Sequence, residues 1–305
     1  MEKELTTPIL FLVFNRPDTT KRVFEAISKS RPKQLFVAGD GPRADKAGDG
    51  EKCEKVRQIA TNVDWDCEVK TLFRDKNLGC GVAVDSGIDW FFENVEEGII
   101  LEDDCFPSQS FFLFCQELLE KYRGDKRVMM ISGDNFQFGK RRTNYSYYFS
   151  RYTHCWGWAS WRRAWRYYDR DMGNWPFIRD NGYLYDILQD KRAVKYWERI
   201  FETVYHGRID IWSYQWAFSC WIQNGLTVLP NVNLVSNIGF DGDATHTTGK
   251  DNANFKIPVF NLSFPLKHPN WMIKDKRADD YTQKTHFNQP NIFYRVIRRL
   301  CRLIS

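Results

Sequence analysis

The sequence contains no C-x-x-C cysteine pair and no long apolar run. Its eight cysteines are scattered along 305 residues and lack the neighbouring histidines of a zinc site, so we expect reduced, mostly buried thiols. The apolar segment ILFLVF near the N-terminus stops at Asn15, Arg16 and Pro17, which makes it too short for a signal peptide or a membrane span. This segment is therefore predicted to be a buried strand.

The chain also lacks a strong charge imbalance. It carries 44 Lys and Arg against 39 Asp and Glu, a net charge of +5, which argues against nucleic-acid binding but is compatible with a phosphorylated ligand or an acidic membrane. A content of 43% hydrophobic and 16% aromatic residues supplies a packed core. We find no internal repeat, no low-complexity segment and no Pro-, Gly- or Ser-rich linker, so a single compact unit is expected.

The first 132 residues alternate between short apolar runs and helical patterns. The predicted strands are ILFLVF, QLFVAG, CEVKTLF, GIIL and RVMMIS, and the predicted helices are DTTKRVFEAISKS, a segment from Glu51 to Thr61, VAVDSGIDWFFENV and FFLFCQELLEKY. This alternation predicts an α/β fold with a mostly parallel sheet and helices on both faces. Asp18 and Ser108 are the expected N-caps of the first and last of these helices.

Polar segments follow four of the predicted strands: NRPD, GDGPR, RDKNLGCG and EDD. Because ligands of parallel α/β sheets bind outside the carboxyl ends of the strands, these loops are expected to meet at one rim. Beyond residue 140 the sequence becomes rich in Trp and Tyr. We therefore expect a nucleotide-binding half and an aromatic half.

The segment GIILEDDCFPS places Glu102, Asp103 and Asp104 directly behind a buried strand. Adjacent buried carboxylates repel one another unless a positive group lies beside them, and a divalent cation is the favoured candidate. Oxygen ligands favour Mg²⁺ or Mn²⁺ over Zn²⁺, and such cations commonly bind substrate phosphates as well. The alternative, an acidic cap on the next helix, explains the three residues equally well.

The loops after the first three strands carry further candidates. Asn15 and Arg16 could bind a base or phosphate or form a structural ion pair. Asp40 could accept a hydrogen bond from a pyrimidine or simply stabilise an Asp-Gly turn. Asn77 and Gly79 lie in DKNLGCG, where a sugar diphosphate could approach the backbone closely, although glycine at such a turn is often purely geometric.

The aromatic half offers candidate acceptor residues. A helix beginning near Trp158 would place Trp158, Trp161 and Trp165 on one side, a stripe that is more often core than binding site. The 12 tryptophans nevertheless exceed the needs of a core. Flat rings with a polar edge suit sugars, so Trp156, Trp158 and Trp212 are candidates for an acceptor cleft.

Two polar residues of this half are also candidates. Asp210 precedes an aromatic helical segment, where an acid is held ionised and oriented, so it is either a general base or a plain N-cap. His246 lies in the polar loop GFDGDATHTTGK and is either a surface residue or a distant third metal ligand.

Together these segments resemble the metal-dependent glycosyltransferases of the GT-A fold, in particular the N-acetylglucosaminyltransferase I-like family and bacterial polysaccharide-assembly glycosyltransferases. The resemblance covers roughly residues 8 to 250 and rests on their order and spacing. The matching segments are LVFNRPDTTKRVFEAISKSRP, GDG at 39 to 41, ILEDDCFPSQSFFLF, WGWASWRRAW and LPNVNLVSNIGFDGDATHT.

The resemblance implies a Rossmann-like nucleotide-diphospho-sugar transferase fold and an inverting transfer from a UDP-sugar to a glycan hydroxyl. It implies that Arg16 and Asp40 hold the nucleotide and that Asp104 binds Mn²⁺ or Mg²⁺. Glu102 and Asp103 would support the metal's waters and the ribose. Asp210 would be the base, although Ile211 intervenes here before the tryptophan, whereas the family's base lies immediately before it.

The resemblance also implies partners and a location. The acceptor would be a glycan or lipid-linked glycan of bacterial surface polysaccharide assembly, with no nucleic acid partner. Without the family's N-terminal anchor, a cytoplasmic protein is expected, peripheral on the inner face of the cell membrane if the basic amphipathic tail NIFYRVIRRLCRLIS binds anionic lipid rather than packing on the domain. The expected divisions are 1–140 for the nucleotide-sugar half, 141–288 for the acceptor half and 289–305 for the C-terminal helix.

Two other classes of function remain open from the residues. A nucleotidyltransferase of similar fold would attack the α-phosphorus, but it usually has a glycine-rich phosphate loop after the first strand, and NRPDTTKR lacks those glycines. A non-catalytic carbohydrate-binding protein would account for the aromatic residues but not for the acidic triplet.

Overall fold

The computed structural model describes residues 4–239 and 257–287. In the first half the elements are β1 (Ile9–Val13), α1 (Pro17–Ser30), β2 (Gln34–Gly39), α2 (Asp49–Thr61), β3 (Glu68–Phe73), α3 (Cys80–Asn94), β4 (Glu97–Glu102), β5 (Cys105–Pro107), α4 (Gln109–Tyr122) and β6 (Val128–Ser132). In the second half they are β7 (Tyr147–Ser150), β8 (Trp158–Trp161), α5 (Arg162–Trp165), α6 (Trp175–Asp180), α7 (Tyr183–Leu188), α8 (Lys191–Tyr205), α9 (Ser213–Ile222), β9 (Leu226–Pro230), β10 (Val235–Asn237), α10 (Lys276–Thr282) and the π-helix η1 (Gln283–Phe287).

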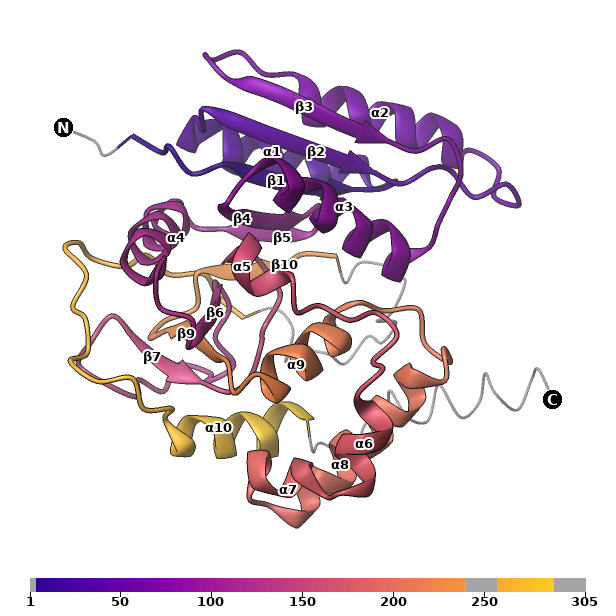
Figure 1. Cartoon of the computed structure of the whole chain (residues 1–305). Helices are drawn as coiled ribbons and strands as arrows, with labels where there is room; N and C mark the ends of the chain where they lie inside the picture. The colour runs from indigo at the N-terminus through magenta and orange to yellow at the C-terminus, as the bar shows by residue number, and fades with distance from the viewer. Residues whose placement is uncertain (1–3, 240–256, 288–305) are drawn as a thin grey trace.

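One eight-stranded sheet joins both halves in the order β3-β2-β1-β4-β8-β6-β9-β7; Figure 1 shows β1 to β4 in its upper part and β6, β9 and β7 below them. Strands β1 to β4 are mutually parallel, and β6 and β9 run in the same direction, whereas β8 and β7 are antiparallel to their neighbours. The predicted α/β fold with a mostly parallel sheet is therefore confirmed. Because β8 lies between β4 and β6, the second half completes the sheet of the first.

Helices cover both faces of this sheet, as the continuous apolar strands predict. Alternate residues of β1 enter different cores: Ile9 and Phe11 pack with α1, α2 and α4, whereas Leu10 and Leu12 pack with α3 and the helices α5 to α9. All four side chains are buried. Because β1 to β4 are parallel, their carboxyl ends meet at one edge of the sheet, together with the loops that follow them.

The tryptophan segment forms a strand and not the predicted helix. Trp158 and Trp161 are the ends of β8, and only a four-residue helix, α5, follows. Side chains alternate across a strand, so Trp158 belongs to one core and Trp161 to the other. Both rings are almost fully buried, and the three-residue spacing that suggested a helical stripe instead places two large rings on opposite faces.

The predicted cap of the first helix is shifted by two residues. Helix α1 begins at Pro17, with Arg16 in the N-cap position and Asp18 within the first turn. Proline suits the first helical position because its missing N–H needs no partner there. Ser108 does occupy the N-cap position of α4, but its hydroxyl lies 3.0 Å from that of Ser110 and makes no capping bond.

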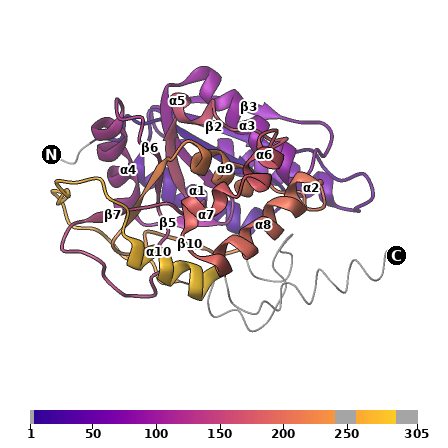
Figure 2. The same ribbon diagram turned by 60° about the horizontal axis from the view of Figure 1, so that its bottom comes forward.

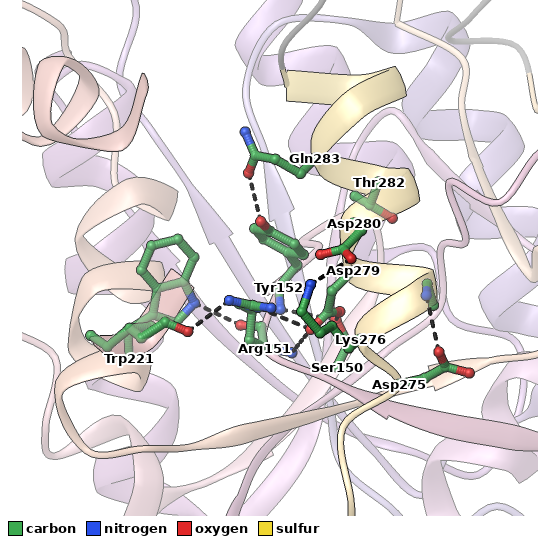
Figure 3. Close-up of polar contacts among 12 residues, drawn as sticks. Ser150, Arg151, Tyr152, Trp221, Asp275, Lys276, Asp279, Asp280, Thr282 and Gln283 are labelled. Atoms are coloured by element: carbon green, nitrogen blue, oxygen red, sulfur yellow. Dashed lines mark hydrogen bonds and ion pairs between the residues drawn. The ribbon is translucent and has the colours of Figure 1, made fainter. Parts of the chain in front are cut away.

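Helix α10 lies beside α7 and α8 at one end of the molecule, which Figure 2 brings forward. A buried ion pair attaches it to the end of β7: Arg151 Nε lies 3.0 Å from Asp279 Oδ2, and the two side chains are 6% and 1% exposed. Ser150 donates to the same carboxylate. The close-up in Figure 3 shows this network, in which Tyr152 also donates to Gln283.

Candidate active site

A cavity of about 440 Å³ opens at the carboxyl edge of β1 to β4. Its lining combines residues from the loops after these four strands with the segment 210–213 before α9. Ten predicted site residues line it: Arg16, Asp40, Asn77, Gly79, Glu102, Asp103, Asp104, Trp156, Asp210 and Trp212. Asn15 and Trp158 are not part of the lining, and His246 lies outside the described residues.

Arg16 supplies a positive charge beside the acidic triplet. Its Nη1 lies 2.8 Å from Asp104 Oδ2, and the backbone N–H of Phe14 donates to Asp103 Oδ2 at 3.1 Å. A guanidinium therefore lies where the sequence favoured a cation. Burial, followed by repulsion from the other two carboxylates, raises the pKa of Glu102 to about 8. Burial and the charge of Asp104 raise the pKa of Asp103 to about 7.

The donor chemistry of this cluster fits a hard divalent cation. One guanidinium faces three carboxyl groups, and burial together with the charge of Asp104 raises the pKa values of Glu102 and Asp103 despite the opposing effect of Arg16. Carboxylate oxygens are the preferred ligands of Mg²⁺ and Mn²⁺. Within residues 4–239 and 257–287, however, no three His, Cys, Asp or Glu side chains are arranged as a metal site.

Asp40 holds the loop after β3 in place. One carboxylate oxygen accepts from the backbone of Gly41 at 2.8 Å, both accept from Leu78, and Oδ2 also accepts from Asn77 Nδ2 at 2.8 Å. Burial raises the pKa of this carboxyl group. Asp40 therefore stabilises the Asp-Gly turn that was one of its two predicted roles, and it also binds Asn77. Both residues lie at the cavity wall.

Asn15 contributes to a polar cluster behind the cavity. Its side-chain amide donates to Asp49 Oδ1 at 2.8 Å, and Arg43 binds the same carboxylate through Nε and Nη2 at 2.7 and 3.0 Å. Hydrogen bonds from Arg43 lower the pKa of Asp49 to about 2. Arg43 lines the cavity and lies over the ring of Phe14. No periodicity or motif in the sequence indicates the pairing of Arg43 with Asp49.

Asp210 caps a helix, but not the one that follows it. Its Oδ2 accepts from the backbone N–H of Cys80 at 2.7 Å and its Oδ1 from that of Gly81 at 2.8 Å. These residues begin α3, whereas α9 begins at Ser213 without a side-chain cap. An ideal Cβ on Gly79 would lie 2.5 Å from Asp210 Oδ2. The carboxylate of Asp210 therefore occupies the space beside Gly79 where the sequence predicted a diphosphate.

The predicted acceptor tryptophans have different environments. Trp158 is fully buried and stacks on Trp212 with ring centroids 5.6 Å apart, so it supports the cavity wall from behind. Trp212 is itself only 2% exposed, yet it lines the cavity together with the half-buried Trp156. The ring of Phe136 packs against that of Trp156, with the ring centroids 5.1 Å apart. Of the three, Trp156 offers the most accessible ring.

Several lining residues were not among the individually predicted site residues: Arg43, Cys80, Cys105, Cys155, Ser213, Asn237 and Gly239. Gly239 shows why. A Cβ at this position would lie 2.3 Å from Asp104 Oδ2 and 2.8 Å from Arg16 Nη1, so the ion pair leaves space for glycine alone. Such a requirement depends on contacts between segments far apart in the chain, and local spacing does not reveal it.

The described part of the chain also bears on membranes and thiols. None of its helices combines the length and apolar character needed to cross a bilayer. Its seven cysteines form no disulfide. The tail 289–305, for which an amphipathic helix is predicted, lies outside the described residues.

No known family model and no curated protein matches the sequence. Solved structures with local similarity include a mannosyltransferase from Pyrobaculum calidifontis in complex with GDP-Man and Mn²⁺ (14% identity, TM-score 0.36, covering 51% of this chain and 44% of that one). HddC from Yersinia pseudotuberculosis has 9% identity, a TM-score of 0.31 and coverages of 52% and 78%.

A UDP-glucose pyrophosphorylase in complex with UDP-glucose has 10% identity, a TM-score of 0.28 and coverages of 48% and 62%. The match covers less than half the length of the mannosyltransferase.

Proposed function

We propose that the protein is a metal-dependent inverting glycosyltransferase that moves a sugar from a UDP-sugar to a hydroxyl group of a glycan acceptor. One observation carries this proposal: the loops after four parallel strands and the segment 210–213 bring basic, acidic and aromatic side chains to a single cavity. Parallel α/β sheets bind their ligands at this edge. A volume of about 440 Å³ falls in the range of small-molecule sites.

The loops after β1 to β4 form the donor side. Arg16 would contact the nucleotide phosphates, and Asp40 and Asn77 would lie beside the uracil, because both residues line the cavity next to the loop after β1. Asp104 would hold Mn²⁺ or Mg²⁺, while Glu102 and Asp103 would support the metal's waters and the ribose. When bound, the cation would supply charge neutralisation for the leaving diphosphate.

The segment from Asp210 to Ser213 forms the acceptor side with Trp156. The Asp210 carboxylate takes the proton of the acceptor hydroxyl, and the hydroxyl oxygen forms a bond to the anomeric carbon as the bond from that carbon to the diphosphate oxygen breaks. Each carboxylate oxygen accepts one backbone N–H and retains a second lone pair for this role. The attack comes from the face opposite the leaving group, so the configuration inverts.

Thermal unfolding with and without Mn²⁺ tests the donor site. The wild type, Asp104→Ala and the exposed control Asp66→Ala, whose side chain is 95% exposed, are each heated with UDP, GDP and a panel of their sugar derivatives. A ligand at about one hundred times its Kd stabilises by roughly 2.7 kcal/mol, which raises Tm by a few degrees. We expect UDP compounds to raise Tm only with Mn²⁺, and only when Asp104 is present.

Product analysis then separates the classes of function. Release of UDP together with a glycosylated acceptor supports sugar transfer. Release of pyrophosphate from a nucleoside triphosphate and a sugar phosphate would contradict sugar transfer and indicate nucleotidyl transfer. Binding of glycans without any nucleotide-dependent shift would contradict both reactions and indicate a carbohydrate-binding protein. The three-residue connection 14–16 between β1 and α1 favours the first outcome, because it contains no glycine and is too short for a glycine-rich phosphate loop.

A further inference from the structure

We infer that the first turn of α3 is a cradle that positions the Asp210 carboxylate, and that Gly81 is therefore a positioning residue. The two groups come from opposite halves of the chain. Backbone N–H groups of Cys80 and Gly81 each donate to a different oxygen of Asp210, at 2.7 and 2.8 Å. This two-point attachment fixes both the location and the rotation of the carboxylate, which a single hydrogen bond would not.

Two glycines in this turn, Gly79 and Gly81, leave the space that the Asp210 carboxylate occupies. A Cβ on Gly79 would lie 2.5 Å from Oδ2, and one on Gly81 would lie 2.6 Å from Oδ1 of Asp210. Gly79 also has a φ of +83°, so glycine is favoured there for its conformation alone. Gly81 has no such backbone requirement. The contacts that a Cβ would make with Asp210 Oδ1 at 2.6 Å, and with the backbone N and O of Ile211 at 3.3 and 3.4 Å, account for a helix-disfavouring residue at position 81.

The end of α3 also stabilises the negative charge of Asp210 and leaves part of this side chain accessible from the cavity. Helix α3 spans 15 residues, and the free N–H groups and positive end of its dipole stabilise a negative group at the first turn. Asp210 remains exposed on its other side and lines the cavity. An anchored carboxylate with an open face can approach an acceptor hydroxyl without first being ordered.

The cradle joins the donor and acceptor sides of the cavity. Helix α3 packs against the sheet through Ile88 and Phe91, whereas Asp210 leads directly into Ile211 and Trp212 of the acceptor wall. Displacing the carboxylate should therefore change turnover more than donor binding. This catalytic consequence rests on the proposed function, because it takes Asp210 as the base, but the cradle itself does not.

A double-mutant cycle without substrate tests the cradle. Gly81→Ala, Asp210→Ala and the double variant are compared by Tm, with Gly124→Ala as control because a Cβ at Gly124 meets nothing within 4 Å. Alanine normally favours a helix, so Gly81→Ala should raise Tm unless it collides with Asp210. We expect it to lower Tm in the wild type and to lower it much less in the Asp210→Ala background, where only the contacts with the Ile211 backbone at 3.3 and 3.4 Å remain. An equal decrease in both backgrounds would overturn the inference.

Kinetics test the consequence for catalysis. With the UDP-sugar that gives the largest thermal shift, we expect Gly81→Ala to lower kcat roughly 10- to 100-fold and to leave the donor KM within about twofold. Gly124→Ala should leave both unchanged. If Asp210→Ala abolishes turnover but Gly81→Ala does not reduce it, the positioning role is wrong. If Asp210→Ala itself has wild-type turnover, the proposed base is wrong, while the Tm cycle still decides whether the cradle exists.

Discussion

The guanidinium of Arg16 and the carboxylate of Asp104 join two loops of the sheet edge across a distance of 2.8 Å. The residues follow β1 and β4, which are neighbouring parallel strands. With side chains 20% and 17% exposed, the pair is shielded but reachable from the cavity. It offsets part of the negative charge at the acidic triplet and occupies one oxygen of the proposed metal ligand.

Replacing Arg16 should affect the two proposed ligands in opposite directions. In Arg16→Gln, loss of the competing cation should tighten Mn²⁺ binding by about 1 kcal/mol, or roughly fivefold, because the pair is partly exposed. UDP binding should weaken, since a phosphate contact is lost. Electron paramagnetic resonance of free Mn²⁺ and UDP titration measure these changes. Arg22→Gln, an exposed change on α1, controls for net charge. Weaker Mn²⁺ binding in Arg16→Gln would argue against Asp104 as the ligand.

The acidic triplet should make the protein less stable as pH rises. The pKa values of Glu102 and Asp103 are raised to about 8 and 7, so the folded state retains protons that the unfolded chain releases. Their stabilising contribution is present at low pH and is lost between about pH 4 and 8. Glu102→Gln cannot ionise at this position, so it should lose less stability than the wild type between pH 6 and pH 8.5. In urea unfolding, the difference in unfolding free energy between variant and wild type should be about 1–3 kcal/mol more favourable to the variant at pH 8.5 than at pH 6. Saturating Mn²⁺ should reduce the wild-type slope. A wild type that is equally stable at both pH values without metal would contradict this prediction.

Removing one partner of the buried pair of Arg151 and Asp279 should strongly destabilise the protein. Asp279→Ala leaves a buried guanidinium without its carboxylate (Figure 3) and should cost about 3–5 kcal/mol. The neighbouring Asp280 forms an exposed pair with Lys276, so Asp280→Ala should change the unfolding free energy by no more than about 0.5 kcal/mol. Chemical denaturation measures both. The double variant Arg151→Met with Asp279→Leu should recover part of the loss, and equal effects of the two alanine variants would refute the assignment.

His286 should limit stability on the acidic side. It stacks on Phe136 with ring centroids 3.9 Å apart, and burial lowers its pKa to about 4. The unfolded chain therefore binds a proton that the folded state excludes, and stability falls as pH decreases from about 6.5 to 4. The loss should amount to about 1–3 kcal/mol. His286→Phe keeps an aromatic ring without the charge, so its stability should decline less than that of the wild type between pH 6.5 and 4.5. Parallel curves would exclude this role.

Much of the first half was predictable because its signals are local. The apolar runs around Leu10 and Leu35, the helical pattern ending at Thr61 and the cap position of Ser108 each depend on neighbours a few residues away. The direction of parallel strands then places Arg16, Asp40 and Asp104 at one edge without knowledge of their partners. Their roles in binding and transfer remain proposals for the experiments described above.

The sequence by itself determined the alternation of strands and helices, and with it the edge at which the polar loops meet, because hydrophobic periodicity and strand direction are local properties. Tertiary structure decided the partners. Asp104 meets Arg16 and Asp210 reaches the first turn of α3, across 88 and 129 residues. Trp158 lies in a strand despite its helical spacing, because β8 pairs with β4 on one side and with β6 on the other. Contacts between distant segments depend on how the whole chain packs, and no short pattern encodes that arrangement.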